Sequence, residues 1–352
     1  MRRPSMPGTM AAAAVLVLAG AAGCGGGTVA DDGPGGRPET VTVQLDYRLR
    51  GNHGIFYVAD RLGYFRQEGI KVADIKQGTG STDAVRIVGN GRAQFGFADL
   101  PTLVTARSHG VPVKALAVVN QSSPLAMCSL KARVRLGKAA DLKGLTVGIH
   151  PAGSTFIFYK ALLAANGVDR KAIKQASVTP PYENYLMRKK VDAVPCYIDA
   201  EVPLLQKAAG GPDKLSVMLG SDAGYKVYGS GLIASDEMIK KHPGVVQRFT
   251  NAYLRAFSYV EQHPEETARI LAATSPENAL KSPVFLRQLQ ADISHSFNSE
   301  ATRARGLGAM EETRWQDVIG TLAKQKVLTG RPLATKDVYD QAFVDAYNAK
   351  NR

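Results

Sequence analysis

Apolar and polar positions alternate with two different periods along most of this chain. VTVQLD, residues 41–46, alternates apolar and polar side chains as a strand does, and the apolar residues of 55–65 then recur at helical spacing. Strands over 70–75, AQFGFAD and VPVKALAVVN follow, with the helical stretches GTGSTDAVRIVGNG and PTLVTARSHG between them. This succession predicts an α/β fold with a mainly parallel sheet and helices on both of its faces.

A second run of the same kind begins near Pro124. Its predicted strands are PLAMCSL, LTVGIH, KQASV, VDAVPCY, LSVMLGSD and YKVYGSGLIAS. Its predicted helices are GSTFIFYKALLAANG, YENYLMRKK and AEVPLLQKA. From Asp236 onward amphipathic helical spacing prevails, and no fixed-period repeat occurs. We therefore expect two α/β units, the first of which is completed by the C-terminal helices.

The first 24 residues, MRRPSMPGTMAAAAVLVLAGAAGC, have the features of an export signal. Two arginines precede an apolar stretch that is too short to span a bilayer, and small residues then lead to Cys24. The segment predicts a lipoprotein signal peptide over residues 1–23, with Cys24 lipidated as the first mature residue. Ala21 stands where such signals usually have leucine, and an ordinary secretory cleavage site is the alternative. Residues 24–40, rich in Gly, Pro and acidic side chains, predict a flexible tether.

Composition and charge narrow the choice of function classes. The 352 residues carry a formal net charge of +13, and 45% of them are hydrophobic, which suits a chain with a sizeable core. The Lys and Arg residues are spread along the chain without a zinc-finger, basic-zipper or RNA-binding motif, so nucleic acid is not an expected partner. We expect a solvated basic surface instead.

Cysteines and histidines give few signs of catalytic chemistry. Beyond Cys24 the chain has Cys128 and Cys196, which an oxidising compartment allows to form a disulfide, and two separate buried thiols are the alternative. The six histidines lack the spacing of metal ligands, and no G-x-S-x-G nucleophile motif occurs. No metal, cofactor or catalytic residue is therefore expected.

Several motifs, in their order and spacing, resemble one known family. LDYRLRGNHGIFYVADRLGYFRQEGI, GRAQFGFAD, DLKGLTVGI and the helical stretch that begins YGSGLIASDEMIKKHPGVVQRF are similar to the corresponding parts of the SsuA/THI5-like (NMT1-like) solute-binding proteins of ABC importers. The resemblance covers about residues 41–272. Ala93 and Gln94 depart from it, because the family usually has an acidic residue there, and Tyr47 stands where tryptophan is common.

The resemblance implies a type II periplasmic-binding architecture, in which two α/β lobes are joined by a hinge and enclose a cleft. Residues 41–123 and 224–352 would form lobe one, and residues 124–223 would form lobe two. Ligands of open α/β sheets bind beyond the carboxyl ends of the strands. Closure of two such edges over a ligand by hinge motion would bury it.

This rule selects polar side chains that follow predicted strands. The candidates of lobe one are Asp46, Tyr47, Asn52, His53, Ser81 and Asp99. The candidates of lobe two are Ser154, Thr155, Tyr197 and Glu201. Tyr47 can stack on a planar ligand, as the family's tryptophan does, and Glu201 can accept from an aminopyrimidine. Helix capping is the alternative for Asn52 and Asp99.

The resemblance implies an extracytoplasmic solute-binding protein, and the signal segment predicts that lipid at Cys24 anchors it to the cell membrane. Its partners would be the permease and ATPase subunits of an ABC importer and a small-molecule ligand, and the protein itself would be a monomer. The expected ligand is a heterocycle similar to the thiamine pyrimidine. The alternative ligands within the same transporter class are aliphatic sulfonates, taurine and nitrate.

A pyrimidine-synthesising enzyme of the THI5 type is the alternative from another functional class. Fungal relatives of this type use a lysine and a histidine for their chemistry, and the matching stretch GFADLPTL has neither. The cysteine cluster of those enzymes is also missing from the sequence. We therefore expect a binding protein and not an enzyme.

Overall fold

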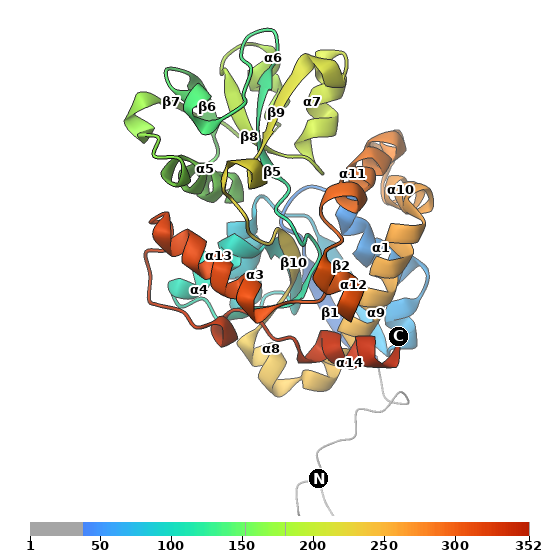
Figure 1. Cartoon of the computed structure of the whole chain (residues 1–352). Coiled ribbons are helices and arrows are strands. Elements are labelled where there is room, and N and C mark those ends of the chain that lie inside the picture. The colour runs from blue at the N-terminus through green and yellow to red at the C-terminus, as the bar shows by residue number, and fades with distance from the viewer. Residues whose placement is uncertain (1–37, 152, 180, 352) are drawn as a thin grey trace, which may run out of the picture. The chain divides into compact units, whose positions relative to one another are not determined.

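The computed structural model describes residues 38–151, 153–179 and 181–351, so the predicted signal peptide, Cys24 and nearly all of the predicted tether lie outside it. The described chain folds into two five-stranded sheets, each covered by helices (Figure 1). The predicted α/β class with two lobes is confirmed. We call the body around the first sheet the first lobe and the body around the second sheet the second lobe.

The first sheet has the strand order β2-β1-β3-β10-β4. Its strands are β1 (Glu39–Gln44), β2 (Ile70–Lys76), β3 (Phe95–Asp99), β4 (Val113–Val118) and β10 (Ser230–Ser235). β1 runs parallel to β2 and β3, whereas β10 runs antiparallel to both β3 and β4.

The second sheet repeats this plan in the order β7-β6-β8-β5-β9. Its strands are β5 (Leu125–Leu130), β6 (Thr146–Ile149), β7 (Lys174–Ser177), β8 (Ala193–Tyr197) and β9 (Leu215–Leu219). β6 pairs in parallel with β7 and β8, and β5 pairs antiparallel with β8 and β9.

Both sheets are mixed, although the sequence predicts mainly parallel ones. The antiparallel strand is β10 in the first sheet and β5 in the second. In each case it is the strand by which the chain enters the sheet from the other lobe, and no helical crossover precedes it. The two connections between the sheets are residues 119–124 and 220–229, and the predicted lobe boundaries fall within them. YKVYGSGLIAS, predicted as one strand, pairs only from Ser230, because Tyr225 and Tyr228 pack in the core instead.

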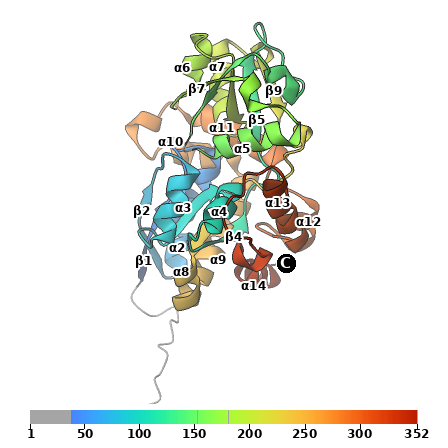
Figure 2. The ribbon, with the colours of Figure 1, turned by 90° about the vertical axis from the view of Figure 1, so that its left-hand side faces the viewer.

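Helices cover both faces of the sheets (Figures 1 and 2). The helices of the second lobe are α5 (Ser154–Ala165), α6 (Glu183–Met187) and α7 (Glu201–Ala209). The N-terminal part of the chain gives the first lobe the 3-10 helix η1 (Gly51–His53) and the helices α1 (Gly54–Arg61), α2 (Tyr64–Gln67), α3 (Ser81–Gly89) and α4 (Leu100–Ser108). The C-terminal part adds α8 (Asp236–Lys241), α9 (Pro243–Gln262), α10 (Pro264–Ala272), α11 (Ser282–His295), α12 (Glu300–Arg305), α13 (Glu312–Lys324) and α14 (Ala342–Lys350).

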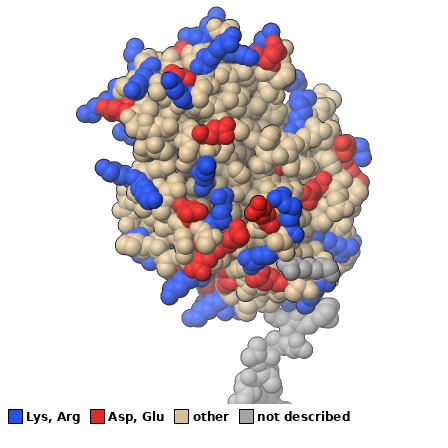
Figure 3. All heavy atoms as spheres, in the orientation of Figure 1, with Lys and Arg blue, Asp and Glu red and all other residues tan. Residues whose placement is uncertain are grey.

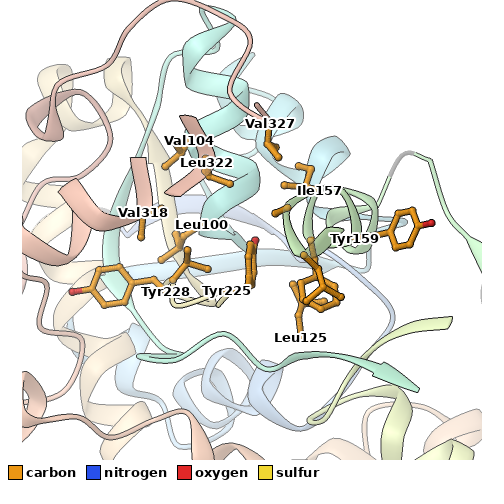
Figure 4. Close-up of a cluster of buried hydrophobic side chains, with 14 of the residues drawn as sticks. Leu100, Val104, Leu125, Ile157, Tyr159, Tyr225, Tyr228, Val318, Leu322 and Val327 are labelled. Atoms are coloured by element: carbon orange, nitrogen blue, oxygen red, sulfur yellow. The ribbon is translucent and has the colours of Figure 1, made fainter. Parts of the chain in front are cut away.

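One apolar cluster is shared by the two lobes. Leu100 and Val104 on α4 lie with Ile157 on α5 and Leu322 on α13 in this cluster, and all of them are buried or nearly so (Figure 4). Both ribbon views place α4 next to α5 (Figures 1 and 2). The lobes are therefore joined by buried apolar side chains as well as by their two chain connections.

A disulfide joins the two central strands of the second sheet. Cys128 on β5 and Cys196 on β8 are bonded, with their Cα atoms 6.1 Å apart. The pair lies diagonally across neighbouring strands, since Cys128 pairs with Val194 and Cys196 with Ala126. Of the two arrangements that the sequence left open for these cysteines, the structure has the bonded one.

The surface and the helices add two observations on partners. Lys and Arg side chains are interspersed with Asp and Glu on the face drawn in Figure 3 and form no continuous basic stripe there. Within the described ranges, no helix combines the length and the apolar character needed to cross a membrane.

Candidate functional site

A small polar cavity lies between the lobes, where the carboxyl ends of strands from both sheets meet. Its volume is about 30 Å³, which is roughly the space that one water molecule takes in the liquid. Seven of the ten predicted ligand-binding residues line it, namely Asp46, Tyr47, Ser81, Ser154, Thr155, Tyr197 and Glu201. The rule that places ligands at strand ends thus gathers these residues around one space.

Three predicted residues do not line the cavity. Asn52 and His53 form part of η1 and are fully buried, Asn52 against Asp199 of the second lobe and His53 against Asp46. Asp99 ends β3 and caps α4, accepting from the Thr102 backbone N–H at 3.0 Å and from the Thr102 hydroxyl at 2.6 Å. Their side chains bond to protein groups behind the cavity wall.

A buried ion cluster forms the wall on the first lobe. Asp46 Oδ2 accepts from Arg50 Nη2 at 3.0 Å, and Asp46 Oδ1 accepts from His53 Nε2 at 2.9 Å. Burial alone would raise the pKa of Asp46, but the charge of Arg50 and the hydrogen bond from His53 outweigh it and hold this pKa below its usual value. Burial lowers the pKa of His53, so its ring is neutral and carries the proton on Nε2.

Arg50 is the main cavity residue that the sequence did not indicate. It is 3% exposed, donates through Nε to Asn52 Oδ1 at 3.0 Å and lies 5.2 Å from the centre of the Tyr197 ring. Its position four residues after Asp46 is compatible with an ion pair, but only the folded chain shows that both point into the cleft. His150 and Tyr182 also line the cavity, and Tyr182 hydrogen-bonds to Thr155.

The wall on the second lobe combines hydroxyl groups with one carboxyl group. Ser154 Oγ and Tyr197 Oη lie 2.6 Å apart in a hydrogen bond. Glu201 Oε2 accepts from the Tyr197 backbone N–H at 2.9 Å. Burial raises the pKa of Glu201 to about 7, although that N–H and the charge of Arg50 oppose the rise. Glu201 can therefore either accept from a ligand amino group as a carboxylate or donate as an acid near neutral pH.

A second cavity, of about 270 Å³, adjoins the first. Tyr47, Arg50 and Glu201 line both cavities, and Leu204, Val284 and Phe285 give the second one an apolar wall. We call the first the inner cavity and the second the outer cavity. The outer cavity approaches the lower end of the volume range of small-molecule sites.

A glycine lets the loop before α3 reach the inner cavity. A Cβ atom on Gly78 would lie 2.2 Å from the Leu45 carbonyl oxygen and 2.7 Å from that of Asp46. Only glycine allows the two chain segments to pass this closely. This contact places Thr79, Gly80 and Ser81 beside Asp46 in the cavity wall.

The described residues contain no group of three or more His, Cys, Asp or Glu side chains suited to a metal ion. The inner cavity is lined by three tyrosine rings, a histidine ring, two carboxyl groups and several hydroxyl groups around a buried arginine. Such an arrangement can enclose a flat polar molecule by stacking and hydrogen bonding.

Two α/β lobes with a polar cavity at their facing strand ends define the class of periplasmic-binding folds. The profile of the NMT1/THI5-like family matches residues 50–267, which is more than half of the chain, and the chain belongs to this family. The resemblance found in the sequence motifs is thereby confirmed.

Relatives of this chain include binding proteins and enzymes. It is 27% identical to a formylaminopyrimidine-binding protein of Halalkalibacterium halodurans, and the alignment covers 93% of this chain and 95% of that protein. It is 25% identical to a riboflavin-binding protein of Chloroflexus aurantiacus, and this alignment covers 79% of this chain and 78% of that protein. A 4-amino-5-hydroxymethyl-2-methylpyrimidine phosphate synthase of Legionella pneumophila is 26% identical, with 70% of this chain and 76% of the synthase covered.

The fold is also that of solved binding proteins. The alkanesulfonate-binding protein SsuA of Xanthomonas axonopodis pv. citri, bound to MOPS, superimposes with a TM-score of 0.66 at 15% identity. The superposition covers 87% of this chain and 100% of that one. At this identity the likeness concerns the fold.

Proposed function

We propose that this protein is the extracytoplasmic solute-binding component of an ABC importer and that it captures a planar nitrogen heterocycle similar to the thiamine pyrimidine by lobe closure. The observation that carries the proposal is the inner cavity, whose lining brings Tyr47, Tyr197 and the carboxyl group of Glu201 together between the two lobes. An aminopyrimidine offers a flat ring for stacking and an N–H donor for that carboxylate.

The relatives support this class of ligand. Two of them are named for the binding of formylaminopyrimidine and of riboflavin, which are both planar nitrogen heterocycles. The outer cavity adds room of about 270 Å³ for a ring substituent beyond Tyr47. This room next to the inner cavity favours a substituted heterocycle over a bare ring, once the lobes have opened to admit it.

A sulfonate, taurine or nitrate is the second candidate ligand, and one observation favours it. The hydroxyl groups of Ser81, Ser154 and Thr155 stand at the starts of α3 and α5 and line the inner cavity together with Arg50. The charge of Arg50 is, however, already paired with Asp46, and Glu201 would repel an anion when it is ionised. The heterocycle is therefore the better match.

Binding without chemistry is the proposed activity, although synthases occur among the relatives. This proposal is supported by the stretch GFADLPTL, which lacks the lysine and the histidine that the synthases use. It spans the end of β3 and the start of α4, and its Asp99 caps α4. Incubation of the protein with the heterocycle that it binds, followed by mass spectrometry, should return the compound unchanged. Conversion of that compound into a different one would instead assign the chain to the enzymes of the family.

The location follows from the same proposal. We infer that the mature chain begins at Cys24, carries lipid there and works outside the cell membrane as a monomer beside its permease and ATPase. The disulfide between Cys128 and Cys196 supports an oxidising location. Metabolic labelling with a palmitate analogue should mark the wild-type chain, and Cys24→Ala should abolish the label.

A thermal-shift screen tests the ligand class. The panel contains aminopyrimidines, thiamine, riboflavin, taurine, alkanesulfonates and nitrate. A compound that binds only the folded chain stabilises it by RT ln(1 + [L]/Kd), which is about 2.7 kcal/mol at a hundredfold excess over Kd. We expect a shift with the heterocycles. A shift with sulfonates or nitrate alone would select the second candidate.

Two substitutions test the site itself. Glu201→Gln should weaken binding of the heterocycle by about tenfold to a hundredfold, because a charge-assisted hydrogen bond is lost, and Tyr47→Ala by about tenfold through lost stacking. Titration calorimetry measures both effects, with Glu265→Gln, exposed on α10, as the control. Intact affinity combined with a large loss of stability of the free protein would assign these residues to the fold.

A further inference from the structure

Buried polar side chains join the two lobes behind the inner cavity. Asn52, on η1 of the first lobe, donates through Nδ2 to Asp199 Oδ2 of the second lobe at 2.9 Å. Gln288, on α11, donates through Nε2 to the Ala200 carbonyl oxygen at 3.0 Å. Asn52, Asp199 and Gln288 are all buried. The turn that follows β8 is therefore bonded to two different elements of the first lobe.

Asp199 also contacts the carboxyl group of Asp292, on α11. The two carboxyl groups lie within hydrogen-bonding reach of each other, and both side chains are 0% exposed. Asp199 Oδ1 and Asp292 Oδ2 have no donor among the described protein groups, whereas Asp292 Oδ1 accepts from Asn120 Nδ2 at 2.5 Å. Two ionised carboxylates have no hydrogen to share, so a contact of this kind requires one proton between them.

We propose that Asp199 and Asp292 form a proton-binding site across the lobe boundary, which is filled by one shared proton when the lobes are closed and emptied when they open. In the closed arrangement one carboxyl group donates its O–H to the carboxylate of the other. On opening, water solvates both groups and the proton leaves to the solvent. No bond other than O–H is formed or broken.

The surrounding charges do not replace that proton. Arg50 faces both carboxyl groups, but its guanidinium is already paired with Asp46 at 3.0 Å. Asp46 itself faces Asp199, and Glu201 lies close to Asp199 as well, so the nearby carboxyl groups add negative charge. His53 on η1 is neutral, because burial lowers its pKa. Asn52 and Asn120 supply donors to the outer oxygens without supplying charge.

The sign of the pH dependence follows from these contacts. Burial raises the pKa of Asp199, and burial together with the charge of Asp199 raises that of Asp292 well above its usual value. A closed arrangement therefore binds more protons than an open one, and its advantage is lost as pH rises through the raised pKa. Capture of a ligand by closure, which rests on the proposed function, would weaken with rising pH by up to about tenfold per pH unit through this pair.

Asparagine variants distinguish the effect of the shared proton from the effect of side-chain shape. Asp292→Asn or Asp199→Asn replaces the shared O–H by an amide N–H and keeps the charge of the pair at about −1, since one carboxylate remains. The double variant Asp199→Asn/Asp292→Asn would turn two amide donors toward each other. We therefore expect each single variant to fold and the double variant to be less stable than either one.

The first readout is the equilibrium constant for unfolding of the ligand-free full chain, measured with denaturant from pH 5 to 8. In the wild type this constant should rise with pH more steeply than in Asp292→Asn, by up to about tenfold per pH unit. Asp317→Asn, an exposed substitution on α13, removes one carboxylate elsewhere and should keep the wild-type slope. Equal slopes in the wild type and in both single variants would overturn the proposal.

Infrared difference spectroscopy detects the proton directly. The wild type minus Asp292→Asn should show the C=O absorption of a protonated carboxyl group over the same pH range, and wild type minus Asp317→Asn should not. A difference spectrum without this absorption would also overturn the proposal. Both measurements are made without ligand, so a failed ligand screen would overturn the proposed function and leave the proton site standing.

Discussion

Asp46 and Arg50 show at the residue scale how the first lobe keeps charge inside the cleft. Each is almost completely buried, and each compensates the loss of hydration of the other. The pair also orients Asn52 and the ring of His53 through further hydrogen bonds. Arg50 is therefore held in place before any ligand arrives, which lowers the entropic cost of binding.

Asp46→Asn should lower the free energy of unfolding by about 3–5 kcal/mol, because it leaves the charge of Arg50 buried without its partner. The pKa of Asp46 is depressed, so its contribution is present above the usual carboxyl pKa and is lost as pH falls below it. Urea unfolding at pH 7 and at pH 3 should therefore show a smaller difference between wild type and variant in acid.

Asp83→Asn is the matched control for that substitution. Asp83 pairs with Arg86 at the surface, where the two side chains are 45% and 62% exposed. Removal of such a pair should change the free energy of unfolding by less than about 1 kcal/mol. An Asp46→Asn effect as small as this one would show that Arg50 finds water or another partner in the cleft.

Glycine gives a second test at the residue scale. Gly78→Ala should destabilise the fold by about 1–3 kcal/mol, because its Cβ would press on the backbone of Leu45 and Asp46. Gly320→Ala, in the interior of α13 with open space around it, should instead stabilise by up to about 1 kcal/mol. Thermal unfolding distinguishes the two; a neutral Gly78→Ala would mean that the loop of residues 78–81 can move away from Asp46.

The sequence predicted the elements much better than the contacts between them. Strands and helices follow from local periodicity, and the strand-end rule alone brings Asp46, Ser81 and Tyr197 together. It could not show that Asn52 is buried against Asp199, because that contact joins residues far apart in the chain. Asp292 was out of reach for a different reason, since nothing near it in the chain indicates a partner in the other lobe.

The disulfide belongs to the scale of the element, because it ties two neighbouring strands of the second sheet. It closes a loop of 68 residues between Cys128 and Cys196. In the chain-entropy account such a loop contributes about 4 kcal/mol of stability. Cys128→Ala/Cys196→Ala should lower the free energy of unfolding by about this amount in a denaturant titration. A double variant as stable as the wild type would show that the disulfide does not contribute to the stability of the sheet.

At the scale of the whole molecule, the apolar cluster shared by α4, α5 and α13 couples the lobes (Figure 4). Neither lobe can unfold without exposing the side chains of this cluster to water, at a cost of about 25 cal/mol per Å². We expect one cooperative unfolding transition for residues 38–351, with equal calorimetric and van't Hoff enthalpies. Two separate calorimetric peaks would show that the cluster does not couple the lobes.

The size of the inner cavity also has a meaning at this scale. About 30 Å³ cannot accommodate a heterocycle, so a ligand can enter only if the lobes separate or Tyr47 moves. Two connections, residues 119–124 and 220–229, allow such a hinge motion. Binding rates should then depend on the opening of the cleft as well as on diffusion.

The bond between Cys128 and Cys196 finally has a consequence for when the protein matures. Thiols stay reduced in a cytoplasm, so a chain that is still on that side of the membrane lacks the contribution of about 4 kcal/mol. Its unfolded fraction would be about a thousandfold larger there than after oxidation, since 1.4 kcal/mol corresponds to a factor of ten. An export machinery that threads unfolded chains would thus meet a precursor that is easier to unravel, and oxidation after crossing would make the folded state hard to reverse.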